Sequence, residues 1–150
     1  METNYDALIQ ASADELFSKM EQKESAEDMA RLRDAFEFAR EAHLPQKRKS
    51  GEPYIIHPVS VARIVAEELE LGPDPVIAAF LHDVVEDTSY TIDDIRERFG
   101  DEVAFLVGVV TKEKKAKYVQ SKQIDNFRQI LASMQYDVRA LLIKLADRLH

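Results

Sequence analysis

The sequence predicts an all-α protein, and three observations lead to this fold class. The chain of 150 residues contains only four glycines and five prolines, which leaves few residues for the tight turns of an all-β fold. Wherever the apolar residues have a clear period, it is the three-and-four spacing of one helix face, and no segment has a convincing strand pattern. The length and the apolar fraction of 45% predict one globular domain with a core of its own.

The first two helices are predicted from apolar stripes and a capping pattern. The first stripe lies on one helix face in residues 9–20. Ser25, with an acidic residue three positions later, resembles a capping box and begins a second helix that reaches about His43. We therefore expect residues 1–24 to form a leading helix and residues 25–150 to form the helical core that carries the motifs.

The middle of the chain is predicted to form helices separated by breakers. Pro58 suits the first position of a helix because its missing N–H has no partner there. Asp74 is expected to cap the next helix, and Thr91 with Asp94 to begin another through a capping box that Gly100 closes. The remaining boundaries are the polar loop PQKRKSGEP from Pro45, the breaker Gly72-Pro73, and a helix that starts at Asp101.

The final segments are a loop and two more helices. The last helix is apolar on nearly all sides, which is typical of a buried helix. Asp147 lies one turn from Ile143 on an apolar face, and burying a carboxylate costs on the order of several kcal/mol unless a cation or hydrogen-bond donors satisfy it. The segments are a lysine-rich loop with Lys112, Lys114, Lys115 and Lys117, a helix from Ser121 to Met134, and the last helix from Asp137 to His150.

Composition and charge exclude several classes of function. The net charge of −8 disfavours nonspecific binding to DNA. No apolar run approaches the roughly 20 residues of a membrane span, and the N-terminus does not resemble a signal peptide, so we expect a cytoplasmic protein. The absence of cysteine means that any metal is held by nitrogen and oxygen. The basic stretch 47–49 could serve a small anionic substrate, whereas the second lysine stretch is interpreted as surface.

The segment HDVVED, residues 82–87, requires a chemical explanation. His82 and Asp83 follow Ala-Ala-Phe-Leu and precede Val-Val, inside an otherwise apolar helix. Glu86 and Asp87 each lie one helical turn further on. Four ionisable groups among six residues of core sequence are costly without a function, so the segment predicts a site.

Two further histidines are open to more than one interpretation. His43 fits a core histidine or one that supports a site from behind. His57 lies at the predicted start of a helix, and its residue context alone fits an ordinary helix-start residue equally well. Local geometry does not require His57 to lie beside His82.

The order of these residues and the segments around them resemble a known family. The segments are RKSGEPYIIHP at 48–58, AAFLHDVVEDT at 78–88, FG at 99–100, VTK at 110–112 and IKLADRLH at 143–150. From about Asp28 to His150, the chain is similar to the hydrolase domain of the Rel/Spo family of bifunctional (p)ppGpp synthetase/hydrolases, which belongs to the HD phosphohydrolase superfamily. The resemblance implies an all-α HD-domain helical bundle that removes the 3′-pyrophosphate of (p)ppGpp in the stringent response.

The resemblance also implies a cofactor and a site. It implies one manganese ion, and the nitrogen and oxygen ligands also suit iron or another divalent ion better than zinc. Glu86 and Asp87 would activate and orient the hydrolytic water. The metal ligands would be His57, His82, Asp83 and Asp147, and the substrate-binding loop would contribute Arg48, Lys49 and Ser50.

The family pattern continues beyond His150. We therefore expect the chain to be the N-terminal part of a longer protein, with further helices of the same domain and with synthetase and regulatory domains to follow. The bundle would then be incomplete at its C-terminal end, and the apolar surface left bare would favour self-association.

Two other functions remain open from the residues. One is an HD-family hydrolase of another nucleotide, such as an NADPH phosphatase or a nucleotidase. The other is a regulatory half that senses nucleotide or metal and restrains a synthetase.

Overall fold

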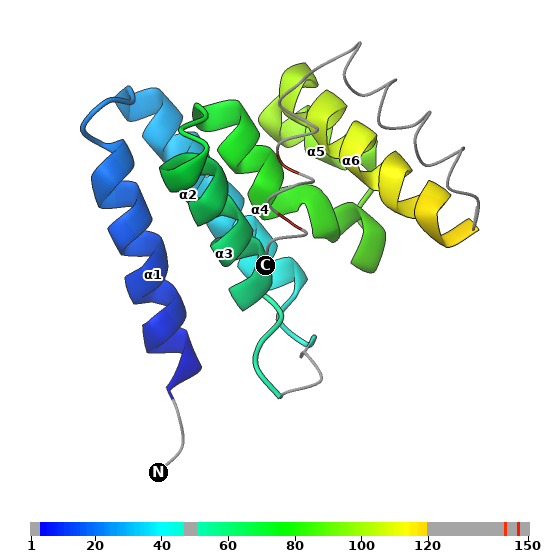
Figure 1. Cartoon of the computed structure of the whole chain (residues 1–150), viewed down its shortest axis with the longest axis horizontal. Helices are drawn as coiled ribbons and strands as arrows, with labels where there is room; N and C mark the ends of the chain where they lie inside the picture. Colours follow the sequence, from blue (N-terminus) through cyan, green and yellow to red (C-terminus); the bar gives the residue numbers. More distant parts are fainter. Residues whose placement is uncertain (1–3, 47–50, 120–142, 144–146, 148–150) are drawn as a thin grey trace.

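The computed structural model describes residues 4–46, 51–119, 143 and 147. These residues form packed helices without a β-strand, so the predicted all-α class is confirmed for the described part (Figure 1). None of its helices is long and apolar enough to cross a membrane. The elements are α1 Tyr5–Met20, α2 Ala26–Ala42, α3 Ile56–Arg63, the π-helical turn η1 Ile64–Glu68, α4 Pro73–Asp87, α5 Ile92–Phe99 and α6 Asp101–Val119.

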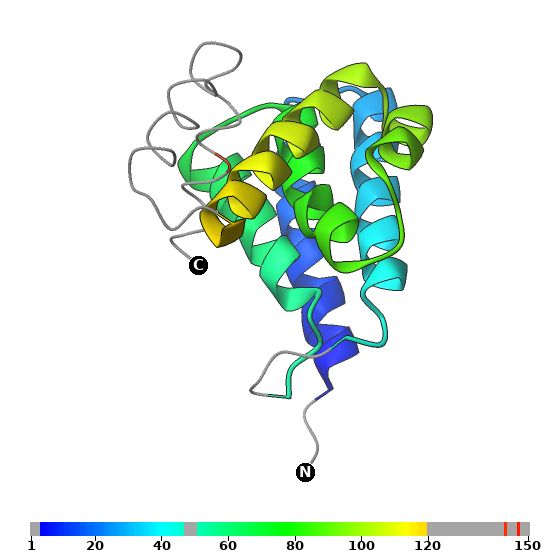
Figure 2. The same cartoon turned by 90° about the vertical axis from the view of Figure 1, so that its right-hand side faces the viewer.

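Helix α4 lies at the centre of the bundle. It packs against α2, α3 and α6, while α1 packs against α2 and α3, and α5 packs against α6. The two views in Figures 1 and 2 show α4 between these neighbours. Every residue from Pro75 to Val84 is buried, as expected of a helix surrounded on most sides. The charged residues at the end of this stretch are therefore enclosed by the fold.

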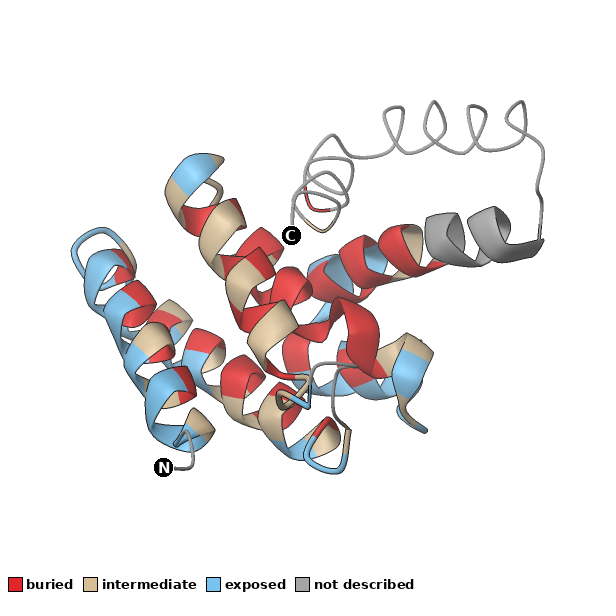
Figure 3. Cartoon of the chain, turned by 60° about the horizontal axis from the view of Figure 1, so that its bottom comes forward, coloured by how far each residue is buried: buried red, intermediate tan, exposed pale blue. Residues whose placement is uncertain are grey.

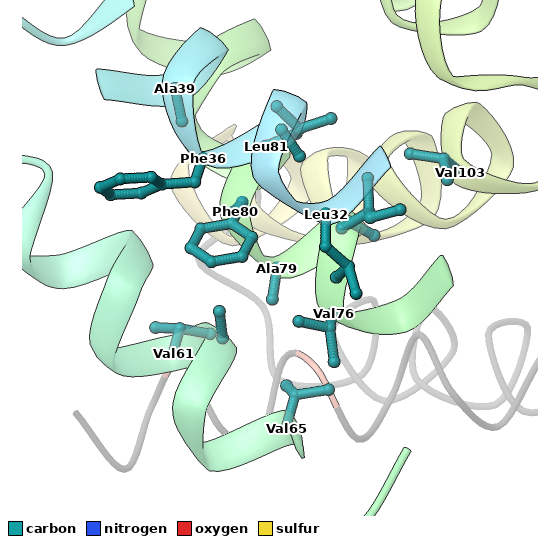
Figure 4. Packing of buried hydrophobic residues seen from close by; sticks show 14 of the residues in the cluster. Leu32, Phe36, Ala39, Val61, Val65, Val76, Ala79, Phe80, Leu81 and Val103 are labelled. Carbon is teal, nitrogen blue, oxygen red and sulfur yellow. The ribbon is translucent and has the colours of Figure 1, made fainter. Parts of the chain in front are cut away.

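The apolar core fills the space between α4 and its neighbours. Figure 4 shows buried side chains from α2, α3, η1 and α6 packed around those of α4, including Phe80. Phe17, Phe36 and Phe80 form an aromatic cluster, with ring centroids 6.0–6.1 Å apart. Full burial of such a side chain stabilises the fold by about 1.5–3 kcal/mol. Figure 3 shows that the exposed residues gather on the outer sides of the helices.

Several predicted helix ends are confirmed. Ser25 caps α2, and its hydroxyl accepts a 3.1 Å hydrogen bond from the Asp28 N–H. Thr91 and Asp94 form a complete capping box at the start of α5. Gly100 ends α5 with φ of 103°, a conformation that glycine adopts without steric cost.

Two predicted helix starts are each wrong by two positions. Helix α3 begins at Ile56, so Pro58 occupies its third position, which is tolerated because the first N–H groups of a helix have no intrahelical partner. Helix α4 begins with Pro73 at its first position after Gly72, so Asp74 does not cap it. The Asp74 carboxylate instead lies 2.8 Å from the Arg31 guanidinium on α2.

The helix predicted from Pro58 onward also changes from α-helical to π-helical geometry before it ends. The Leu69 N–H donates to the Ile64 carbonyl at 3.0 Å, which is the i→i+5 bond of a π-turn. Glu70 then adopts φ of 55°, which reverses the chain before α4.

The predicted lysine-rich loop after Val110 is wrong. The backbone stays helical through Val119, consistent with the good helix propensity of lysine, glutamate and alanine. The two helices predicted from Ser121 and Asp137 lie outside the described residues, except that Ile143 and Asp147 are both helical and Ile143 is fully buried.

Candidate metal centre

The structure brings together four side chains from three parts of the chain. They are His57 at the start of α3, His82 and Asp83 in α4, and Asp147. Each offers one nitrogen or oxygen ligand atom, and these atoms all lie within 4.8 Å of one another. His82 and Asp83 are fully buried, and the side chains of His57 and Asp147 are only 12% and 13% exposed.

Antiparallel packing of α3 and α4 explains why His57 meets His82. At about 1.5 Å per residue, His57 lies about 16 Å before the end of η1, and His82 lies about 14 Å after the start of α4. The two histidines are therefore at similar distances from the connecting turn, and their ring centroids are 5.9 Å apart. The sequence alone did not require His57 to lie beside His82. Their proximity follows from the matched lengths of the two helical segments.

The separations within the cluster match those of atoms that share one ion. Asp147 Oδ1 lies 2.7 Å from His57 Nε2 and 3.2 Å from His82 Nε2. Asp83 Oδ2 lies 3.2 Å from His82 Nε2 and 3.7 Å from His57 Nε2. Ligands at about 2.0–2.2 Å from a metal lie about 3 Å from their neighbours in its coordination sphere.

The orientation of His82 indicates that the cluster needs a positive charge. Its Nδ1 lies 2.6 Å from the Ala79 carbonyl oxygen, which can only accept, so Nδ1 carries the hydrogen. In the neutral ring, Nε2 then has a lone pair that faces carboxylate oxygens of Asp83 and Asp147 at 3.2 Å. Two carboxylates and a lone pair repel one another in a buried site unless a proton or a metal cation lies among them.

The donor set fits a divalent cation. With both imidazoles neutral, the four side chains carry a net charge of −2, which a divalent ion balances. Two imidazole nitrogens and carboxylate oxygens suit transition-metal ions that accept mixed N/O ligands. The hydrogen bond from His82 Nδ1 to a backbone carbonyl is the usual support of a metal-binding histidine.

Tyr54 adjoins the cluster, and the sequence interpretation did not identify it. Its hydroxyl donates a 2.8 Å hydrogen bond to Asp83 Oδ2. Burial, with the nearby carboxylates of Asp83 and Asp87, raises the pKa of Tyr54 well above its usual value. The phenol therefore keeps its hydrogen and remains a donor to Asp83.

His43 and Gln46 lie behind Tyr54. The His43 ring is almost fully buried, lies 4.9 Å from the Tyr54 ring, and its Nδ1 is 2.8 Å from Gln46 Oε1. Burial lowers the pKa of His43, although Gln46 and the carboxylates of Asp83 and Asp87 oppose this shift. The prediction of a buried supporting histidine at position 43 agrees with this geometry.

Glu86 and Asp87 occupy the last turn of α4, one turn beyond His82 and Asp83. Glu86 is partly buried and Asp87 is exposed. The Gln46 side-chain amide donates a 2.8 Å hydrogen bond to the Asp87 carbonyl oxygen, which fixes this helix end. The acidic pair therefore lies on the same helix as two ligand candidates and nearer to solvent.

The other predicted site residues, Arg48, Lys49 and Ser50, lie outside the described residues. Sequence reasoning missed Tyr54 and Gln46, because their partners on α4 are 29 and 41 positions away in sequence. Tyr54 did stand within the recognised segment RKSGEPYIIHP, three residues before His57, which was the only available signal.

Comparison with known proteins gives consistent results. Residues 35–150 match the family model described as the HD domain. The chain is 52% identical over 115 residues to the guanosine-3′,5′-bis(diphosphate) 3′-pyrophosphohydrolase of Aquifex aeolicus, covering 77% of this chain and 16% of that protein. It is 49% identical over 126 residues to the bifunctional (p)ppGpp synthase/hydrolase SpoT of Escherichia coli, covering 83% of this chain and 18% of that protein.

A solved structure shares the fold. It is that of a metazoan ortholog of SpoT described as hydrolysing ppGpp, with a TM-score of 0.66 and 34% sequence identity. The match covers 84% of this chain and 68% of that chain. The chain itself spans less than a fifth of the length of the two curated relatives.

Proposed function

This chain belongs to the HD-domain family and, within it, to the hydrolase domain of the Rel/Spo proteins, and we propose that it forms part of a manganese-dependent (p)ppGpp 3′-pyrophosphohydrolase. The proposed reaction adds water across the ester bond between the ribose 3′ oxygen and the first phosphorus. The products are GDP or GTP and pyrophosphate. The functions named for the relatives and for the metazoan structure support this choice of substrate.

The cluster of His57, His82, Asp83 and Asp147 is the single observation that carries the proposal. Their ligand atoms lie within 4.8 Å of one another in a mostly buried site, and two imidazole nitrogens with two carboxylates suit a divalent cation. Phosphate ester hydrolysis at neutral pH requires such a centre or an equivalent source of charge stabilisation. When bound, a divalent ion supplies Lewis-acid chemistry that makes water more acidic and withdraws charge from phosphate oxygens.

The residues around this centre then have separate roles. Glu86 takes the proton from the attacking water as general base, and Asp87 orients that water. Arg48 and Lys49, which precede His57 in the sequence, offset the charge on the 3′-pyrophosphate, and Ser50 belongs to the same loop that receives the nucleotide. The bifunctional name and the greater length of the SpoT relative support a parent protein that also carries a synthetase domain.

The direct test offers ppGpp and NADPH, with Mn²⁺, to the chain and to a form extended through a complete hydrolase domain. We expect the extended form to release GDP and pyrophosphate from ppGpp and to lose this activity in a chelator. Efficient phosphate release from NADPH without ppGpp cleavage would instead identify a hydrolase of another nucleotide. Tight nucleotide binding with neither reaction would favour the regulatory function.

A further inference from the structure

The contact between Tyr54 and Asp83 joins the candidate centre to the segment that precedes α3. Tyr54 donates to Oδ2 of Asp83, the same oxygen that faces the Nε2 atoms of His82 and His57. A carboxylate oxygen has two lone pairs. A phenol on one of them leaves the other for a cation and fixes the rotation of the carboxylate.

Two imidazole rings lie next to the Tyr54 ring. The ring of His43 lies 4.9 Å from it, and the ring of His57 meets it edge-on at 6.0 Å. The Tyr54 N–H donates to the Gln46 carbonyl at 3.0 Å, which anchors its backbone. The same Gln46 is tied to α4 through the Asp87 carbonyl, so the donor and the helix that carries Asp83 are fixed to one another.

Asp83 needs this support more than the other carboxylate does. The Asp83 side chain is 1% exposed, so hydrogen bonds from the protein must replace its solvation by water, whereas the Asp147 side chain is 13% exposed. Hydrogen bonds from partners behind a metal ligand orient that ligand, and their loss typically lowers metal affinity or activity about 10- to 100-fold.

We propose that Tyr54 is a positioning residue that sets the orientation of Asp83 for binding a divalent cation, with His43 and Gln46 holding the phenol in place. This role rests on the proposed metal-dependent function. It acts through Asp83 and involves no contact between Tyr54 and the substrate.

The variant Tyr54→Phe tests the role because it keeps the ring contacts and removes only the hydroxyl. Tyr90→Phe is the matched control, since the Tyr90 ring is 40% exposed and packs against Phe38 at 4.6 Å. For parent, Tyr54→Phe and Tyr90→Phe, we would measure Mn²⁺ affinity by calorimetry and thermal unfolding in a chelator. In the extended form, turnover would be followed across a range of Mn²⁺ concentrations.

We expect Tyr54→Phe to bind Mn²⁺ about 10- to 100-fold more weakly, with unfolding like that of Tyr90→Phe. Its turnover should be low at limiting Mn²⁺ and recover at saturating Mn²⁺, with an unchanged KM for the nucleotide. Parent-like Mn²⁺ affinity in Tyr54→Phe, or a turnover defect that saturating Mn²⁺ does not restore, overturns the positioning role but leaves the proposed function in place. Failure of the parent to bind Mn²⁺ or another divalent ion overturns both.

Discussion

Helix α4 serves two buried clusters that differ in what they need. Phe80 packs with Phe17 and Phe36 in an aromatic cluster. His82 and Asp83, two and three residues further along the same helix, face His57 and Asp147. The aromatic cluster is complete in itself, because burying apolar surface is favourable without any partner from outside. The polar cluster brings two carboxylates and two imidazoles together and is balanced only by an added positive charge.

The two clusters should therefore control different properties of the protein. The aromatic cluster should determine the stability of the metal-free fold. The polar cluster should not stabilise that fold, because its buried carboxylates and the His82 lone pair repel one another without a cation, and it should determine metal binding and turnover instead. Substitutions only a few residues apart on one helix should therefore have opposite consequences.

The largest expected effect is on turnover and concerns Glu86. Glu86→Gln should lower turnover about 100- to 10,000-fold, because the amide cannot accept the proton of the attacking water. Mn²⁺ affinity and stability should stay close to those of the parent. Glu97→Gln on the exposed side of α5 is the control. Steady-state assays of the extended form check this, and near-parental turnover for Glu86→Gln would remove Glu86 from the mechanism.

Phe80→Ala should have the opposite effect: it should lower stability and leave metal binding unchanged. Truncation of this fully buried ring should lower the free energy of unfolding by about 3–5 kcal/mol. The protein that remains folded should still bind Mn²⁺ with the affinity of the parent. Chemical denaturation in a chelator and calorimetry under folding conditions measure the two quantities, and Phe80→Leu offers a milder version. A loss of Mn²⁺ affinity as large as that of a ligand variant would break the distinction between the clusters.

The smallest effect concerns the pH dependence of stability and His43. Burial lowers the pKa of His43 below its ordinary value of 6.5, against the opposing influence of Gln46, Asp83 and Asp87 and with the help of His82. The unfolded chain therefore binds a proton that the folded chain resists. This contribution to stability is present above pH 6.5 and is lost as the pH falls below it.

A metal-free comparison of the parent with His43→Gln isolates this contribution. Between pH 7.5 and pH 5.5, the parent should lose more free energy of unfolding than the variant, because only the parent has the buried imidazole at position 43. Equal losses in the two proteins would mean that His43 is as easily protonated in the folded state as in the unfolded state.

The sequence predicted most of the fold because the helix faces and ends have local causes. The stripe in α1, the Ser25 cap and the Thr91–Asp94 capping box depend on residues within one or two turns, and the structure has all three. The π-turn after Arg63 was missed because inserting one residue in a turn barely alters an apolar period. The lysine stretch after Val110 is helical although its charge predicts a loop, because lysine, glutamate and alanine all have good helix propensity.

Site residues could be predicted from the sequence only where an ionisable side chain stands among apolar residues. His82, Asp83 and Asp147 stood out as ionisable residues in apolar helices, and the structure gathers them with His57. The role of His57 as a ligand was predicted only from the family resemblance, because its neighbours in the sequence are those of an ordinary helix start. Tyr54 has an ordinary sequence context, and its contact with Asp83 depends on how α2, α3 and α4 pack. Residues 48–50 and the assignment of manganese stay predictions.

The most direct test of the central claim is a calorimetric titration of the chain with Mn²⁺. The parent should bind one ion, and Asp83→Asn and Asp147→Asn should lose this binding. Neither variant should unfold more easily than the parent in a chelator, because each removes one of two buried charges that repel each other. Asp34→Asn, which alters a carboxylate paired with Arg98 on the surface at 2.7 Å, should bind as the parent does. Equal Mn²⁺ binding by all four proteins would contradict the claim that these side chains form a metal centre.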